Sequence, residues 1–284
     1  MVMRKEDIAV VVPTRNSGST LAMCLESVRS QSLPCYLVVV DNGSTDETLM
    51  IAQTYADLVM NGGPERSAQR NAGAAMVSAL YVGFIDSDME LAPTVVEEAV
   101  GALVAGAISV VVPEQTVGEG FWAEVRAFER SFYRGNDSIE APRFFRRDVF
   151  DAVHGFDEEM TGAEDWDLGI RVRGLGSQVH TKAEILHHEG RVRYFSACRK
   201  KGYYGPGILL FMKKYRTSGL KEATQREWLR RPLSLCSTLG AGLLLLKAGE
   251  AFAIVATTAK EKLVKIVGRS GRRLSEQLGK NGFR

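Results

Sequence analysis

Cysteine is scarce in this sequence, and its spacing does not suit a disulfide framework or a zinc site. The four cysteines stand at Cys24, Cys35, Cys198 and Cys236, with no CxxC pair among them. Isolated thiols of this kind are typical of a reducing compartment. A secretory signal is not recognisable either, because the apolar run at residues 8–12 is too short for its central region. We therefore expect the folded part to lie in the cytoplasm.

Internal repeats and low-complexity linkers are absent as well. The 284 residues are 45% hydrophobic and 25% charged, an ordinary composition for a globular protein that excludes wholesale disorder. The length suits one large α/β domain, or a domain of about 200 residues followed by a tail.

A large net charge is also missing, but the formal total of +2 hides an asymmetry. From Arg191 onward there are 21 Lys and Arg against 5 Asp and Glu, whereas the preceding residues hold 15 against 29. An acidic amino-terminal part and a basic carboxyl-terminal part indicate that the carboxyl-terminal part faces an anionic surface, either membrane lipid or nucleic acid.

Short apolar runs alternate with helical spacing in the first half. We expect buried strands at residues 8–12, 36–40, 81–85 and 107–112. Helices are expected at residues 20–30, 44–55, with Ser44 and Glu47 as a capping box, and 66–77, and Pro93 suits the first turn of another. This alternation predicts a mainly parallel sheet covered on both faces by helices.

The pattern loosens after Pro113. Helical stretches at about 121–133 and 165–173 flank a possible strand at 143–146, and residues 178–186 resemble a strand that leads into His187. From Tyr203 the chain turns helical and basic, and from Leu233 it is strongly apolar.

Polar clusters follow three of the expected strands, at Pro13-Thr14-Arg15-Asn16, Asp41-Asn42-Gly43-Ser44 and Asp86-Ser87-Asp88. Each cluster alone would be a turn. Because ligands of such sheets bind at the carboxyl ends of the strands, we expect all three to meet at one edge.

The aspartates Asp86 and Asp88 suit a hard cation. Carboxylate oxygens are the ligands that Mg²⁺ and Mn²⁺ prefer, and such ions are often shared with substrate phosphates. A pair of aspartates is common in turns, so the pattern gains its weight from the buried strand before it and from the two matching strand ends.

Other residues of these clusters have both a structural and a functional interpretation. Asp41 can accept a hydrogen bond from a nucleobase, or it can begin an Asx turn. Arg15 and Arg70 can contact a base or a diphosphate, because a guanidinium matches phosphate oxygens, or they can be solvated surface residues.

Taken in order and spacing, Val12-Pro13-Thr14-Arg15-Asn16, the segment 39–46, Arg70-Asn71-Ala72-Gly73 and Asp86-Ser87-Asp88 resemble the family 2 glycosyltransferases. The resemblance covers about residues 6–190 and implies the GT-A fold. It also implies that Asp41 contacts the base, Asp86 the ribose or a metal-bound water, and Asp88 a Mg²⁺ or Mn²⁺ ion. The remaining donor-binding residues that it implies are Pro13, Thr14, Arg15, Asn16, Asn42, Arg70 and Ser87.

Two later segments extend the resemblance. Glu164 and Asp165 match the family's Glu-Asp segment, which implies that Asp165 is the general base and that Glu164 binds or orients the acceptor; alternatively, both acids simply enrich a helix amino terminus. His187 and His188 match a late histidine that serves as a metal ligand or diphosphate contact. Neighbours on a strand face opposite ways, so only one of them can serve, and we choose His187. A plain surface strand end is the alternative.

The carboxyl-terminal segment is apolar at residues 233–246 but is interrupted by Lys247 and Glu250. We expect one or two helices in the membrane interface, or a shallow hairpin, flanked by basic residues. These flanking residues are Arg230, Arg231, Lys260, Lys262 and Lys265. A core-packing or oligomerisation helix pair is the alternative, and nucleic-acid binding fits the apolar stretch less well.

Together these patterns predict a cytoplasmic enzyme at the membrane surface. A GT-A domain at residues 1–200 would bind the nucleotide with about residues 1–115 and the acceptor with 116–200, and 201–284 would form a helical basic tail. The expected reaction is an inverting, metal-dependent transfer of one sugar from a UDP- or GDP-sugar to a hydroxyl of a glycan or polyprenyl-linked acceptor. A homo-oligomer remains open.

Other functions fit less well. A sugar nucleotidyltransferase would need a glycine-rich basic loop after the first strand, and a dehydrogenase a GxGxxG there; neither is present. A non-catalytic nucleotide-sugar-binding scaffold would be expected to lack Asp86, Asp88 or Asp165, all of which are present.

Overall fold

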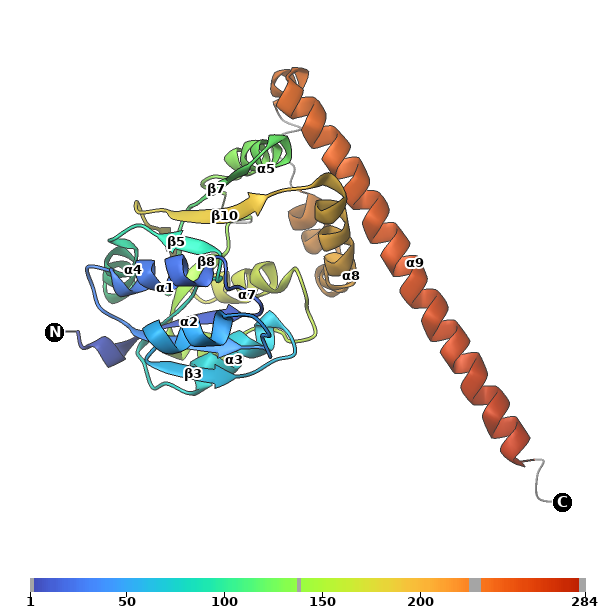
Figure 1. Ribbon diagram of the computed structural model, residues 1–284, viewed down its shortest axis with the longest axis horizontal. Helices are drawn as coiled ribbons and strands as arrows, with labels where there is room; N and C mark the ends of the chain where they lie inside the picture. The colour runs from blue at the N-terminus through green and yellow to red at the C-terminus, as the bar shows by residue number, and fades with distance from the viewer. Residues whose placement is uncertain (1–2, 137–138, 225–230, 281–284) are drawn as a thin grey trace.

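The central element of the fold is a seven-stranded sheet in the order β3-β2-β1-β4-β8-β6-β9. A computed structural model describes residues 3–136, 139–224 and 231–280 (Figure 1). The strands are β1 (Ile8–Thr14), β2 (Tyr36–Asp41), β3 (Leu58–Asn61), β4 (Tyr81–Phe84), β6 (Ser109–Val111), β8 (Pro142–Arg146) and β9 (Gln178–His180). Strands β1 to β4 pair in parallel, and β8 runs antiparallel to both β4 and β6. The mainly parallel α/β sheet of the prediction is therefore confirmed.

Helices cover both faces of this sheet because its inner strands are apolar on both sides. All seven residues of β1 are buried. Its side chains Ile8, Val10 and Val12 pack with α1 (Leu21–Arg29) and α4 (Val95–Val104), and Val11 packs on the opposite face. The helices that cover this second face are α3 (Arg66–Ala75), α6 (Arg147–Ala152) and α7 (Glu164–Arg173).

A second sheet of three strands, in the order β5-β10-β7, stands beside the first. Its strands are β5 (Met89–Leu91), β7 (Glu114–Glu119) and β10 (Ile185–Arg191), and α5 (Phe121–Ser131) follows β7. Strand β10 runs antiparallel to β5, which places His187 opposite Met89, next to Asp88. The sheet thus brings the late histidine to the aspartate pair.

Two local predictions are wrong. The expected strand at 178–186 is divided into β9 and β10, which belong to different sheets. Between them, the hydroxyl of Thr181 donates a hydrogen bond to the carbonyl oxygen of Ala183. Helix α2 (Thr48–Tyr55) begins later than expected, because Ser44 donates to Asp41 instead of capping the helix. Asp46 Oδ1 accepts the backbone N–H of Thr48 in its place, at 3.1 Å.

Two long helices follow the sheets. Helix α8 (Tyr194–Thr224) leaves helical geometry at Arg216, and α9 (Thr238–Lys280) is one continuous helix that extends away from the domain in Figure 1. Both pack against α5 through a cluster of buried side chains that includes Val125, Ala197 and Leu243. A single helix α9 replaces the hairpin that was one of the expectations.

Within the described residues, one helix segment, Thr238–Lys260, is long and apolar enough to cross a membrane. Of the expected flanking residues, Arg230 lies outside the described residues, as do the side chains of Lys262 and Lys265.

Glycine at position 73 lets α3 approach the sheet closely, and it provides a test of the packing. A Cβ atom there would lie 2.5 Å from Val11 Cγ1 and 2.9 Å from Val40 Cγ2. We expect Gly73→Ala to lower the free energy of unfolding by about 1–3 kcal/mol through overpacking, as measured by urea denaturation. Gly101→Ala in α4 is the matched control. No atom lies within 4 Å of a Cβ at Gly101, so this change should raise stability by about 0.5–1 kcal/mol.

Candidate active site

The three polar strand ends meet at one edge of the large sheet, as predicted. Thr14 and Asp41 are partners in the register of β1 and β2. Gln69 Nε2 of α3 joins the same two strands by donating to the carbonyl oxygens of Thr14, at 3.0 Å, and Val40, at 2.7 Å. The third strand end joins them through Ser87, whose hydroxyl lies 2.9 Å from that of Ser17. Their convergence therefore follows from parallel pairing and from one buried amide.

A cleft of about 570 Å³ opens at this edge, between the strand ends, β10 and α8. Pro13, Thr14 and Arg15 line it. The residues of the Asp86-Ser87-Asp88 segment line it as well, together with Glu164, Asp165 and His187. Most of the predicted site residues thus face one cavity.

Asp41, Asn16 and Asn42 are not among the residues that line the cleft, and their side chains hold its loops. Asp41 is 5% exposed and accepts hydrogen bonds from the backbone and hydroxyl of Ser44, as the Asx-turn interpretation predicts. Asn16 Oδ1 accepts the backbone N–H of Thr45, at 2.8 Å, and Asn42 Nδ2 donates to the carbonyl oxygen of Pro64, at 2.7 Å. In this arrangement the three side chains shape the loops beside the cleft.

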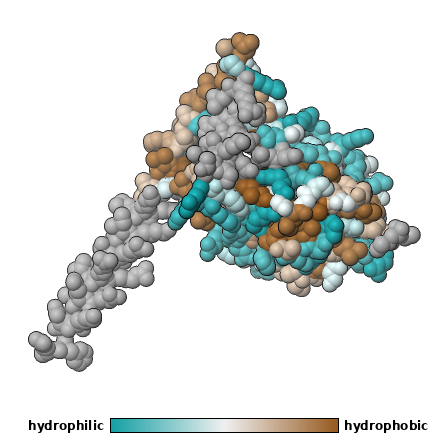
Figure 2. All heavy atoms as spheres, turned by 180° about the vertical axis from the view of Figure 1, so that it is seen from behind, coloured by the Kyte–Doolittle hydropathy of each residue, from teal (hydrophilic) through white to brown (hydrophobic). Residues whose placement is uncertain are grey.

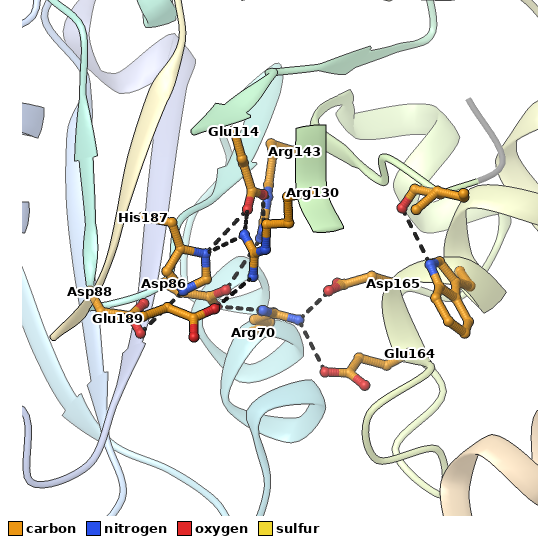
Figure 3. A network of polar contacts seen from close by, with 12 residues as sticks. Arg70, Asp86, Asp88, Glu114, Arg130, Arg143, Glu164, Asp165, His187 and Glu189 are labelled. Atoms are coloured by element: carbon orange, nitrogen blue, oxygen red, sulfur yellow. Dashed lines mark hydrogen bonds and ion pairs between the residues drawn. The ribbon is translucent and has the colours of Figure 1, made fainter. Parts of the chain in front are cut away.

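Arg70 lies fully buried beneath the cleft, so the surface interpretation of this residue is wrong. Its Nη2 is 2.6 Å from Asp86 Oδ1, and its Nη1 is 3.1 Å from Asp165 Oδ1 (Figure 3). The guanidinium also lies over the ring of Phe156, 5.0 Å from its centroid. One arginine therefore connects Asp86, which follows β4, to the Glu-Asp segment in the first turn of α7.

The carboxylate of Asp86 is held ionised by its neighbours. Burial alone would raise the pKa of Asp86, but Arg70 and Arg143 outweigh it and bring this pKa well below its usual range. Arg143 Nη1 is 3.4 Å from the second oxygen of Asp86, and Arg143 Nη2 is 2.5 Å from Glu114 Oε1. Both oxygens of Asp86 thus face arginines.

His187, and not its neighbour, faces the aspartate pair. Its Nε2 is 3.3 Å from Asp88 Oδ2, and its Nδ1 is 3.2 Å from Glu114 Oε2. Burial alone would lower the pKa of His187, but hydrogen bonds to these two carboxylates raise it to about 9. His188 points elsewhere and lies 2.8 Å from Glu90. The alternation of β10 therefore separates the two histidines as expected.

The donor set at this point fits a divalent cation only in part. Asp88 and His187 offer an oxygen and a nitrogen at the cleft, and Glu114 is placed to accept the Nδ1–H that would leave Nε2 free for a metal. Asp86, the third predicted ligand, is turned toward Arg70 and Arg143. In the described part of the chain, no group of three or more acidic, histidine or cysteine side chains is arranged around one metal position. Further ligands would have to come from substrate phosphates and water.

Glu164 and Asp165, in the first turn of α7, have different surroundings. Glu164 is 3% exposed and pairs with Arg66 at 3.1 Å; burial, with the charge of Asp165, raises its pKa. The side chain of Asp165 is 35% exposed and reaches the cleft. Of the two acids, Asp165 is therefore the more accessible to a substrate, and Glu164 lies between the half-exposed Arg66 and the buried Arg70.

Sequence reasoning missed Glu114, Arg130 and Arg143, which surround the pair Asp86 and His187 (Figure 3). Arg130 Nη1 lies 2.9 Å from both Glu114 Oε2 and His187 Nδ1. One signal was available, because an arginine within the apolar segment Pro142–Arg146 must find a carboxylate if that strand is buried.

Comparison with known proteins points to one enzyme family. Residues 9–157 match the sequence model of the family described as "Glycosyl transferase family 2". An uncharacterized glycosyltransferase YibD of Escherichia coli (strain K12) is 30% identical over 104 residues, which cover 34% of this chain and 30% of that protein. The pre-mycofactocin glycosyltransferase of Mycobacterium tuberculosis is 27% identical over 220 residues, 70% of this chain and 46% of that protein. The matched part thus spans less than half the length of these relatives.

Among solved structures, the fold is similar to that of the mannosyltransferase PcManGT from Pyrobaculum calidifontis in complex with GDP-Man and Mn²⁺. The TM-score is 0.61 at 17% identity, with 89% of this chain and 86% of that chain covered. At this identity the similarity shows the fold alone, which is the predicted GT-A fold.

Arg70 provides a test of the site's architecture. We expect Arg70→Met to lower the free energy of unfolding by about 3–5 kcal/mol, because it leaves Asp86 and Glu164 without their buried cation. Urea denaturation followed by circular dichroism measures this loss. Arg15→Met, at an exposed cleft position, should change stability by less than about 0.5 kcal/mol. Equal stabilities of the two variants would contradict the structural role of Arg70.

Proposed function

The chain belongs to glycosyl transferase family 2, and we propose that it is a glycosyltransferase. In this proposal it moves one sugar from a UDP- or GDP-sugar to a hydroxyl of a glycan or lipid-linked acceptor, with inversion. The observation that carries the proposal is the bridge formed by Arg70, which fixes Asp86 and Asp165 at one cleft. In this assignment about residues 1–115 bind the donor, 116–200 the acceptor, and 201–284 the membrane.

The donor occupies the strand-end side of the cleft in this proposal. Thr14, Arg15 and Ser87 line it there and are placed to contact the nucleotide. Asp88 and His187 would hold Mg²⁺ or Mn²⁺, and such an ion stabilises the negative charge of a leaving diphosphate. Glu114 would act through His187, because its Oε2 lies 3.2 Å from Nδ1 and would accept the proton of that nitrogen and fix the orientation of the imidazole.

Asp165 is the proposed general base. It lies at the cleft with 35% of its side chain exposed, and Arg70 fixes its Oδ1. A carboxylate in this position removes the proton of the acceptor hydroxyl while the hydroxyl oxygen attacks the anomeric carbon and the bond to the diphosphate breaks. One base is sufficient for such a single displacement, and the neighbouring Glu164 is occupied by Arg66. These features support inversion.

Substitution of the two aspartates separates donor binding from chemistry. We expect Asp165→Asn to lower sugar transfer by at least about 100-fold while the affinity for UDP or GDP with Mn²⁺ is kept. Asp88→Ala should weaken nucleotide binding in the presence of Mn²⁺ but not in its absence. Calorimetry and mass analysis of products from a panel of nucleotide sugars on a crude lipid extract measure both effects.

The panel includes GDP-mannose, which is named with the solved mannosyltransferase. Failure of every nucleotide sugar to be hydrolysed or transferred, together with unchanged nucleotide binding by Asp88→Ala, would refute the proposed function.

We further propose that the protein rests on the membrane surface through α9. The exposed positions of this helix from 238 to 259 form a stripe without a single charged side chain. The stripe consists of Thr238, Ala241, Leu244, Leu245, Ala248, Ala251, Phe252, Val255, Ala256 and Ala259. A surface helix of a soluble domain shows the reverse order, with its polar side outward. In Figure 2 hydrophobic residues gather along this part of the molecule.

The two charged residues of α9 between positions 238 and 259, Lys247 and Glu250, face the catalytic domain instead. Lys247 Nζ is 2.5 Å from Glu129 of α5 and 2.7 Å from Glu250, and Glu250 is 3.1 Å from Arg126 of α5. If α9 crossed the bilayer, these pairs would have to break or α5 would have to enter the lipid. The docked helix therefore fits a position in the plane of the interface, with exposed Arg199, Arg231 and Lys260 available to anionic lipid.

Flotation with anionic liposomes tests this surface. We expect Leu245→Glu and Phe252→Glu each to reduce the bound fraction, with an affinity loss of about tenfold or more, because each removes an apolar contact with lipid. Leu175→Glu is the matched control, since Leu175 is 56% exposed and Leu245 is 55% exposed, but Leu175 lies outside α9. Unchanged flotation, with loss of a dimer in gel filtration, would instead assign the stripe to oligomerisation.

A further inference from the structure

A second cavity, of about 380 Å³, adjoins the cleft. Its walls come from α5, α7, α8 and α9, and we call it the helical cavity. Asp165, Arg143, Arg126 and Lys201 line both spaces. A ligand in the helical cavity therefore has access to the proposed base without occupying the strand-end side of the cleft.

One side of the helical cavity is apolar. Trp166 of α7 lines it, with its indole N–H directed to the carbonyl oxygen of Ile139 at 3.3 Å. Ala251 and Ile254 of α9 line it as well, and Ala251 also belongs to the uncharged stripe that we assign to lipid. A hydrocarbon chain bound in this cavity would thus lie next to the side of α9 that we assign to the membrane.

The charged groups of the helical cavity are almost all paired. Arg143 is 2.5 Å from Glu114, Lys247 is 2.5 Å from Glu129, and Arg126 Nη2 is 3.1 Å from Glu250. In each case a carboxylate of the protein neutralises the cation.

Lys201 is different. Among the described residues it has no carboxylate within 4.0 Å and no hydrogen-bond partner for its ammonium group, although it lines both spaces. Burial lowers the pKa of Lys201, and the charges of Glu250 and Glu129 offset this only in part. The buried Nε of Arg126, which lines both spaces too, also has no hydrogen-bond partner. Arg126 is nevertheless paired with Glu250, and its Nε lies 3.9 Å from Glu189 Oε2. Of these two cations at the junction, Lys201 is therefore the one without a carboxylate within 4.0 Å among the described residues, and an anion would be stabilised beside it.

We propose that the helical cavity binds the acceptor, and that this acceptor is an amphiphile with a phosphate group between its hydrocarbon chain and its reacting hydroxyl. The phosphate lies against Lys201, the chain passes Ile254 and Ala251 toward the lipid, and the hydroxyl reaches Asp165. The assignment rests on the proposed function, since it makes the helical cavity the acceptor side of that reaction.

Binding of small probes to the full chain tests the assignment without any need for turnover. Geranyl phosphate, geraniol and inorganic phosphate are titrated separately and followed by calorimetry. We expect geranyl phosphate to bind at least about tenfold more tightly than either of the other two, because only it has both the anion and the chain. Comparable affinity of geraniol, or of inorganic phosphate alone, would overturn the proposal.

Substitutions at two adjacent lysines locate the anion. Lys201→Met should remove the advantage of geranyl phosphate over geraniol, and Lys201→Arg should retain it. Lys200→Met is the matched control, because it removes the same charge from the neighbouring position, which lines the cleft but not the helical cavity. It should leave the affinity for geranyl phosphate unchanged. Equal losses for Lys200→Met and Lys201→Met would show a diffuse charge effect and refute the site.

The nucleotide provides the remaining distinction, because Lys201 also lines the cleft. UDP and GDP with Mn²⁺ should bind Lys201→Met as they bind the unsubstituted chain. Weakened nucleotide binding with unchanged geranyl phosphate binding would reassign Lys201 to the donor and overturn the proposal. If the chain bound geranyl phosphate through Lys201 but neither bound nor hydrolysed any nucleotide sugar, the proposed function would fail while the phosphate site would stand.

Discussion

The contact of the buried Arg70 guanidinium with Asp86 and Asp165 is the interaction on which the candidate site depends. A cation that is removed from water must be neutralised where it lies, and the carboxylates that do so come from the end of β4 and from the first turn of α7. The position of α7 relative to the sheet is thereby tied to the position of the aspartate pair. The same constraint explains why Asp86 keeps its charge. Asp165 keeps 35% of its side chain exposed at the cleft, whereas Glu164 keeps 3%.

How much of this was predictable depends on how local the signal is. Continuous apolar runs identify buried parallel strands from the sequence, so the common edge of the segments 13–16, 41–44 and 86–88 is predictable from the sequence. Glu114 and Arg143 were not placed, because β7 and β8 belong to a mixed part of the fold whose pairing is non-local. Nothing within a few residues of Glu114 indicates that its partners lie at positions 130, 143 and 187.

Helix α9 is a second case in which the deciding contacts are distant in the sequence. The sequence shows that this segment is apolar, and it indicates that Lys247 and Glu250 would be costly inside a membrane. Their partners, Glu129 and Arg126, are more than a hundred residues away in the sequence, so no pattern within the helix could reveal that these charges point inward. Once the pairs are seen, the interruptions become the reason that the helix docks on α5, and the uncharged stripe becomes its outer face.

The two faces of α9 then have consequences for each other. The inward ion pairs fix the rotation of the helix, so that Ile254 lines the helical cavity while Phe252 and Val255 point away from the domain. Because neighbouring residues of one rigid helix serve the cavity and the proposed lipid contact, an amphiphile can keep its chain in lipid while its polar end lies near Asp165. In this arrangement the apolar wall of the helical cavity accepts the hydrocarbon chain, and Lys201 selects the chains that carry a phosphate. Lys201 and Ile254 lie outside the segment 9–157 that matches the family model. Selection of the acceptor by these two residues would therefore use a part of the chain in which members of one fold are free to differ.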